Sequence, residues 1–138
     1  MVETSFLIMP IGIIHSALTN RADAPRQGSE GAPDAWLEVY SEFSEALDGL
    51  SAGDDVIVLT WFHESQRSVM KVHPRSDPER PLTGVFATRS PDRPNPIGLH
   101  RVTILEIDGN RLHIAPIEAI DGTPVVDIKP VLAQSADS

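Results

Sequence analysis

The chain has 138 residues and a mass of 15.0 kDa, enough for one domain built around one hydrophobic core. Its 41% hydrophobic content excludes an intrinsically disordered chain, and 20 acidic against 11 basic side chains give a formal net charge of −9. The lack of cysteine excludes disulfide frameworks, cysteine-ligated zinc and thiol catalysis, and 12 prolines disfavour a helix bundle.

The N-terminal part of the chain is predicted to hold one strand and one loop. Residues 6–14 form an apolar run with no basic segment before it, so we expect a strand and no secretory signal. Pro10 and Gly12 indicate an edge strand or a bulge. No apolar run reaches the roughly 18 residues of a membrane span, so we expect a cytoplasmic protein. Residues 17–33 are polar and rich in proline and glycine, which predicts a loop.

Residues 35–50 are ambiguous between helix and strand. Their apolar positions fall at helical spacing, but residues 36–40 also suit a short strand. Residues 56–62 are almost continuously apolar and predict a strand that is buried on both faces and ends at His63. Residues 65–82 are polar and contain three prolines, so we expect a long loop there.

The C-terminal half is predicted to be strands joined by tight turns. Residues 84–88 suit a short strand, and three prolines exclude regular structure from residues 90–98. Residues 101–107 alternate, and a turn at 108–110 leads to a second run at 112–116, which predicts a β-hairpin. A further turn at 121–124 precedes a strand at 125–128.

Six or seven short strands with one or two short helices predict a mainly β fold. The expected architecture is a small closed or partly closed β-barrel. We expect one domain over residues 1–132, followed by a flexible tail at 133–138.

Charge is distributed unevenly along the chain. Residues 1–66 carry two basic and eleven acidic side chains, residues 67–101 carry seven and three, and residues 102–138 carry two and six. The basic central segment suits a phosphate, a carboxylate or an RNA backbone, or it is a solvated loop rich in arginine. The acidic remainder argues against broad, non-specific binding of nucleic acid.

The segment 88–98 is the strongest candidate for a binding site. It places Arg89, Arg93 and Asn95 in a loop stiffened by prolines, and such a loop loses little entropy when it binds a ligand. Guanidinium groups donate paired hydrogen bonds to carboxylates or phosphates. A rigid structural loop with solvent-facing arginines is the alternative interpretation.

Other polar residues are weaker candidates. His63 follows the buried strand and suits a base, a ligand or a polar strand end. Asp121 and Lys129 lie near C-terminal turns, where aspartate also has an ordinary turn role. The five histidines are scattered, so no metal site is expected, and no glycine-rich phosphate motif or nucleophile elbow occurs.

Two motifs carry a resemblance to a known family. The sequences GVFATRSPDRPNPIG at residues 84–98 and DGTPVVDIKP at residues 121–130 closely resemble the signature of the TsaA-like family, also called the TrmO family. The resemblance covers about residues 6–130. It implies an S-adenosylmethionine-dependent methyltransferase on a small β-barrel, which forms homodimers and methylates N6 of threonylcarbamoyladenosine at position 37 of tRNA. It also favours a strand at 35–40 and a short helix at 42–49.

Beyond the resemblance, we hypothesise that Arg89 and Asp121 serve catalysis, while Arg93, Asn95 and Lys129 bind the substrate. Glu64 stands where the family often has glutamine, and its charge suits the ammonium or sulfonium of the cofactor. The implied contacts to S-adenosylmethionine are Pro25, Arg26, Gln27, His63, Glu64, Arg89, Leu99, Ala115, Pro116, Ile117 and Glu118.

Two alternatives to tRNA methylation remain open from the sequence. The acidic composition also suits a methyltransferase that acts on a small-molecule acceptor. A non-catalytic module that binds S-adenosylmethionine would carry the same motifs. None of the three requires a metal.

Overall fold

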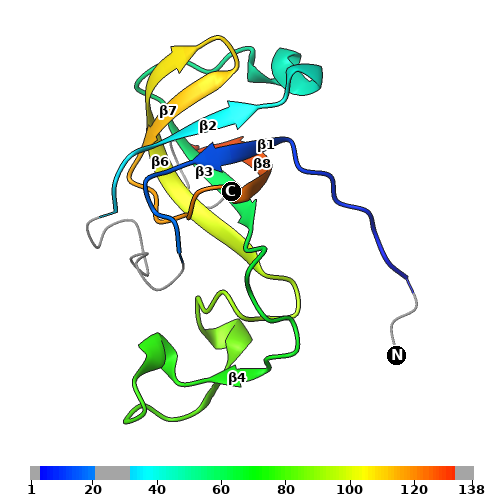
Figure 1. Cartoon of the computed structure of the whole chain (residues 1–138), viewed down its shortest axis with the longest axis vertical. Coiled ribbons are helices and arrows are strands. Elements are labelled where there is room, and N and C mark those ends of the chain that lie inside the picture. The colour runs from blue at the N-terminus through cyan, green and yellow to red at the C-terminus, as the bar shows by residue number, and fades with distance from the viewer. Residues whose placement is uncertain (1–3, 21–31, 133–138) are drawn as a thin grey trace.

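Six antiparallel strands close into a barrel in the computed structural model, which describes residues 4–20 and 32–132 (Figure 1). The order around the barrel is β1–β2–β7–β6–β3–β8, and β8 pairs back to β1. This architecture confirms the predicted mainly β barrel. The strands are β1 (Gly12–His15), β2 (Ala35–Val39), β3 (Asp55–Trp61), β6 (Ile97–Asp108), β7 (Arg111–Ala115) and β8 (Pro124–Pro130).

The barrel interior is a continuous apolar core supplied by alternate residues of every strand. Along β6 the buried residues recur at every second position from Gly98 to Ile104, as the pleat of a strand requires. Two irregularities in the pairing help the sheet to curve shut, one between Leu59 and Thr60 and one between Ile104 and Glu106. The fully buried side chains include Ile14, Leu37, Val56, Val58, Ile104, Leu112, Ile114, Ile117 and Val125.

The ambiguous segment 35–50 is a strand followed by a helix, as the family resemblance favoured. After β2 the chain forms a 3-10 helix, η3 (Ser41–Leu47), at one end of the barrel (Figure 1). Phe43, Leu47 and Leu50 pack against the core from there. The helical spacing of the apolar residues is therefore real, but it belongs to a short element that covers the barrel end.

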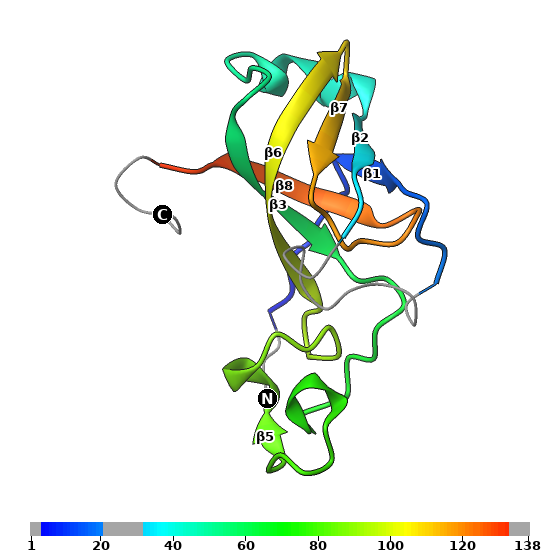
Figure 2. The ribbon, with the colours of Figure 1, turned by 90° about the vertical axis from the view of Figure 1, so that its left-hand side faces the viewer.

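A second region, which we call the lobe (residues 63–96), projects from the barrel between β3 and β6 (Figure 2). It contains the two-stranded pair β4 (Lys71–Val72) and β5 (Thr83–Gly84), and the single-turn 3-10 helices η4 (Pro74–Ser76) and η5 (Val85–Ala87). The long loop predicted for residues 65–82 is therefore confirmed, except that it contains the short elements β4 and η4. From Phe62 to Asn95, a stretch that is described throughout, Val85 is the one buried residue.

The strand predicted for residues 6–14 is wrong in its first half. β1 begins only at Gly12, and Phe6 and Leu7 are 87% and 92% exposed on an extended segment that leads away from the barrel (Figure 1). Pro10 has no N–H for a ladder, and pairing begins with the bond from the Ile11 N–H to the Val125 carbonyl at 2.8 Å. Gly12 is required there, because a Cβ would lie closer than 3.0 Å to the Glu38 carbonyl oxygen.

The strand predicted for residues 84–88 is also wrong. The chain turns into η5 at Val85, because the Val85 carbonyl accepts bonds from the Thr88 N–H, the Thr88 hydroxyl and the Arg93 guanidinium. Such local bonds replace those that a sheet ladder would use. The irregular segment predicted for 90–98 is confirmed up to Pro96, after which β6 begins.

Several expectations fall on parts of the chain outside the described residues. These are most of the loop at 17–33, including Pro25, Arg26 and Gln27, and the tail at 133–138. Within the described ranges, no helix is long and apolar enough to cross a membrane.

Candidate functional site

A groove of about 590 Å³ lies along the first half of β6, on the side of the barrel that faces the lobe. Its volume is in the range of small-molecule sites. It combines charged side chains with apolar ones that are exposed to solvent. The lining residues are Asp55, Phe62, Arg89, Arg93, Ile97, Gly98, Leu99, His100, Arg101, Val102, Thr103, Pro116 and Glu118.

The groove brings together site residues that are distant in the sequence. Arg89 and Arg93 come from the lobe, Leu99 comes from β6, and Pro116 and Glu118 come from the segment after β7. The Ala115–Pro116 peptide bond is cis. Five of the predicted site residues, four of them assigned through the family resemblance, therefore line one surface.

The two arginines of the groove have different surroundings. The Arg93 guanidinium donates to the carbonyls of Val85 at 2.6 Å, Thr88 at 3.2 Å and Ser90 at 3.2 Å. Arg89 is exposed, and no described residue bonds to its guanidinium. Arg93 thus holds the loop in shape, whereas the hydrogen-bond donors of Arg89 are available to a ligand.

Behind the groove lies a buried chain of three polar side chains. His100 Nδ1 lies 2.6 Å from Glu118 Oε1, and His100 Nε2 lies 2.7 Å from Thr60 Oγ1. The His100 side chain is fully buried, and the Glu118 side chain is 13% exposed at the groove. Thr60 is fully buried, so this arrangement of hydroxyl, imidazole and carboxylate does not present a nucleophile to a substrate.

Gly98 leaves space for the side chains that pack around Thr60 and His100. A Cβ at Gly98 would lie closer than 3.0 Å to the Phe62 ring and to Thr60 Oγ1. Phe62 in turn meets His100 edge to face, with ring centroids 5.8 Å apart. The glycine therefore lets an aromatic ring pack directly over the buried imidazole.

Other predicted site residues in the described part of the chain lie beside the groove or away from it. His63 and Glu64 follow Phe62, with Nε2 and Oε2 3.7 Å apart. Asn95 Oδ1 accepts a bond from Arg67 Nη2 at 3.0 Å. Lys129 pairs with Asp127 at 3.1 Å on the outside of β8.

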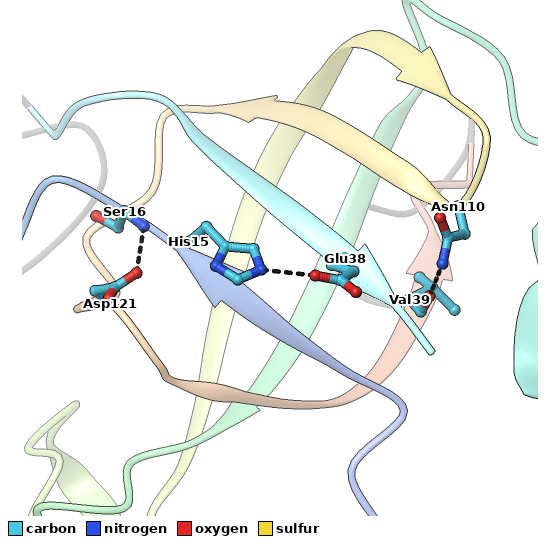
Figure 3. A network of polar contacts seen from close by, with 6 residues as sticks. All are labelled: His15, Ser16, Glu38, Val39, Asn110 and Asp121. Atoms are coloured by element: carbon cyan, nitrogen blue, oxygen red, sulfur yellow. Dashed lines mark hydrogen bonds and ion pairs between the residues drawn. The ribbon is translucent and has the colours of Figure 1, made fainter. Parts of the chain in front are cut away.

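Three more predicted residues lie where the chain leaves the barrel core. Asp121 Oδ1 accepts the Ser16 N–H at 3.0 Å, close to a cross-strand bond between His15 and Glu38, so it fixes a loop (Figure 3). Ala115 ends β7, and Ile117 is fully buried in the core. The segment 115–118 thus points alternate residues to the groove and to the core.

Thr60 and His100 were not among the predicted site residues. A signal was present, because His100 stands two residues from Gly98 and from Val102 in an alternating strand, at a position that should face the barrel interior. A histidine at such a position needs polar partners. Among the residues that the structure describes, no three histidine, aspartate or glutamate side chains gather as metal ligands.

Comparison with known proteins gives the family. Residues 13–138 match the family model described as the tRNA-methyltransferase O N-terminal domain. The chain belongs to this family. The match confirms the resemblance drawn from the two motifs of the sequence.

Curated relatives of this tRNA-methyltransferase O domain share most of its length. A protein of Methanothermobacter thermautotrophicus named "Probable S-adenosyl-L-methionine-binding protein" is 40% identical over 130 residues, covering 94% of this chain and 93% of its own. A protein of Methanocaldococcus jannaschii with a similar name is 54% identical over 97 residues, covering 67% of this chain and 77% of its own.

Solved TrmO structures share the fold. One TrmO from Pseudomonas aeruginosa superimposes with a TM-score of 0.75 at 32% identity and covers 98% of this chain but 60% of its own. Another TrmO structure gives a TM-score of 0.76 at 36% identity, with coverages of 98% and 58%. The chain therefore spans about three-fifths of the length of these crystallised proteins.

Proposed function

We propose that this chain is an S-adenosylmethionine-dependent methyltransferase whose acceptor is tRNA, at N6 of threonylcarbamoyladenosine 37. The main support for this proposal is the groove. Three separate segments contribute to it the side chains of Arg89, Arg93, Leu99, Pro116 and Glu118. Membership of the tRNA-methyltransferase O family and the names of the curated relatives support the same reading. The proposal includes a homodimer that works in the cytoplasm.

The side chains of the groove fit S-adenosylmethionine. The cofactor combines a carboxylate, an ammonium, a sulfonium and an adenosine. Arg89 offers unoccupied donors for a carboxylate, Glu118 offers a carboxylate for a cationic group, and Leu99 and Ile97 are 44% and 40% exposed and offer apolar contact. His63 and Glu64 lie next to the groove and would extend the site.

When bound, S-adenosylmethionine supplies an activated methyl group, so the protein needs mainly to position the reactants. Arg89 would bind the carboxylate of the ligand and Glu118 its ammonium or its sulfonium, while Pro116 and Leu99 would exclude water from the groove. The proton on the acceptor nitrogen must leave, and His63 is a nearby group able to accept one. Arg93 serves the site by holding the loop that carries Arg89.

A small-molecule acceptor is the second candidate, and the net charge of −9 favours it. Methylation of tRNA requires the protein to approach a polyanion, and basic side chains are concentrated in residues 67–101. Binding of tRNA through that segment would weaken steeply as salt rises, whereas transfer to an uncharged small molecule would change little.

The deciding experiment is single-turnover transfer of labelled methyl from S-adenosylmethionine to tRNA from cells that lack the family enzyme. Label in threonylcarbamoyladenosine supports the proposal. Tight cofactor binding without labelled tRNA favours a small-molecule acceptor. If none of the acceptors tested is methylated, the remaining candidate is a non-catalytic binding module. Absence of cofactor binding overturns all three.

A pair of arginine variants tests the assignment of the groove. Arg89→Ala is expected to weaken S-adenosylmethionine binding measured by calorimetry, because it removes the available guanidinium. Arg80→Ala makes the same change of charge on the lobe, beside Asp77 and outside the groove, and serves as the control. Equal affinity of both variants and the parent protein would show that Arg89 is not a cofactor ligand.

A further inference from the structure

The buried chain Thr60–His100–Glu118 is the most unusual polar feature of the barrel. His100 occupies an inward position of β6, between Gly98 and Val102, in a barrel whose other buried side chains are mostly aliphatic. A buried polar side chain costs stability unless its hydrogen bonds are satisfied, and here both ring nitrogens are engaged. A core position of the barrel is therefore occupied by a residue that holds a carboxylate in place.

The two bonds define which ring nitrogen carries the proton. An ionised Glu118 can only accept, so His100 Nδ1 must be the donor across the 2.6 Å contact. The Thr60 hydroxyl lies 2.7 Å from Nε2 and can donate a hydrogen bond to it. With Thr60 as the donor, the hydrogen bonds run from the Thr60 hydroxyl to the imidazole and from the imidazole to the carboxylate.

Of these three side chains, only that of Glu118 reaches solvent. Its carboxylate is engaged through Oε1 and is partly exposed on the wall of the groove that Arg89 and Arg93 also line. Anchoring one oxygen restricts the rotamers of the side chain, so less entropy is lost when the carboxylate receives a ligand.

We propose that His100 is a positioning residue that fixes the Glu118 carboxylate, in its ionised form, as the receptor for the positive charge of the bound cofactor. This inference rests on the proposed function for the identity of the ligand. It assigns the role to His100 and Thr60, which act through Glu118 and do not themselves touch the ligand. The positive charge is either the ammonium or the sulfonium of S-adenosylmethionine.

The first test measures the protonation of His100 in the ligand-free protein. Nitrogen-15 NMR of the imidazole is expected to show a ring protonated at Nδ1. Thr60→Val, which removes the partner of Nε2 at nearly constant volume, is expected to leave the proton on Nδ1, because Glu118 Oε1 still accepts from it. A ring protonated only at Nε2 in the parent protein would overturn the proposal.

The second test measures affinity for S-adenosylmethionine by calorimetry in two His100 variants. His100→Leu removes the donor and is expected to weaken binding by at least about tenfold. His100→Asn retains an amide donor near the position of Nδ1 and is expected to stay within about threefold of the parent. Thermal unfolding of both variants checks that the barrel is intact, and His100→Gln, whose longer side chain places its amide near the position of Nε2 rather than Nδ1, replaces His100→Leu if the latter does not fold.

S-adenosylhomocysteine, which lacks the sulfonium charge but keeps the ammonium, identifies the recognised cation. A preference for S-adenosylmethionine that disappears in Glu118→Gln assigns the sulfonium. An equal loss for both ligands assigns the ammonium. Unchanged affinity for both ligands in Glu118→Gln and His100→Leu would overturn the inference.

The two proposals fail in different ways. If the parent protein does not bind S-adenosylmethionine, the proposed function fails and the receptor role of Glu118 fails with it, while the NMR result still decides whether His100 positions the carboxylate. If the parent binds the cofactor and His100→Leu binds it equally well, the proposed function stands and the role of His100 is refuted.

Discussion

The barrel and the lobe are stabilised by different interactions. The barrel buries thirteen aliphatic or alanine side chains in one cluster and gives every strand a neighbour on both sides. In the lobe, Arg67 donates to the Pro94 carbonyl at 2.7 Å, and Arg93 donates to three further carbonyls. Burial thus shapes one region, and guanidinium–carbonyl bonds shape the other.

The groove lies where these two regions meet, and it takes a different kind of residue from each. The barrel supplies a carboxylate, Glu118, which is anchored by a core histidine. The lobe supplies Arg89 on a loop that Arg93 holds from behind. We therefore expect mutations in the barrel to act on global stability and mutations in the lobe to act on local order.

The largest effect is expected in the barrel core. Leu112 is fully buried on β7, so Leu112→Ala should lower the free energy of unfolding by about 2–5 kcal/mol, measured by chemical denaturation. Leu105→Ala, at a side chain that is 49% exposed on β6, is the matched control and should cost far less. Similar losses for the two variants would contradict the division between core and surface.

The next effect is expected at the junction. Gly98→Ala places a methyl group against the Phe62 ring and Thr60, so the free energy of unfolding should fall by about 1–3 kcal/mol. Gly84→Ala has no atom within 4 Å of the new Cβ and an ordinary negative φ, so it should be close to neutral. Combining Gly98→Ala with Phe62→Leu should restore part of the loss.

A local effect is expected in the lobe. Arg93→Met removes three bonds to backbone carbonyls, so amide hydrogen exchange over residues 85–95 should accelerate by about tenfold or more while the barrel amides keep their protection. Arg101→Met removes only an exposed pair with Asp55 at 3.7 Å and should leave both regions unchanged. Global unfolding by Arg93→Met would show that the regions are not separable.

The smallest effect is expected on the outer face of the barrel. A hydrogen bond from His113, which stacks on Trp36 with ring centroids 4.8 Å apart, holds the pKa of Asp34 below its usual 3.8. Because the folded state lowers this pKa, the stabilisation is present above pH 3.8 and disappears as the pH falls through the folded value. Carboxyl NMR should show a midpoint below 3.8, and His113→Phe, which keeps the stack, should return it toward 3.8.

Most of the barrel could be predicted because its strands follow a period of two. β3 and the β6–β7 hairpin lie close to their expected positions, since alternation and the turn at Gly109 are local signals. The strand predicted for residues 84–88 is wrong because the hydrogen bonds that bend this segment come partly from Arg93, and the local sequence does not reveal where that guanidinium points.

The candidate site was predictable only as far as the two motifs extended. They led to Arg89 and Arg93, but the motif does not say that one guanidinium is bonded to backbone and the other is not. His100 was missed because its role depends on Glu118, eighteen residues away, and on Thr60 of β3, which pairs with Gly98, two residues from His100 along β6. Such pairings arise from barrel closure and strand register, which a pass along the chain does not evaluate.

Closure of the barrel also bears on aggregation. Each of its six strands has a partner on both sides for at least part of its length, so no strand of the barrel has a wholly free edge of N–H and C=O groups. The other described sheet, β4–β5, has edges of two residues, too short to act as a template for strand addition. Strand addition to the folded barrel is therefore confined to the short stretches beyond the paired residues, and a longer fibrillar ladder requires the barrel to open first.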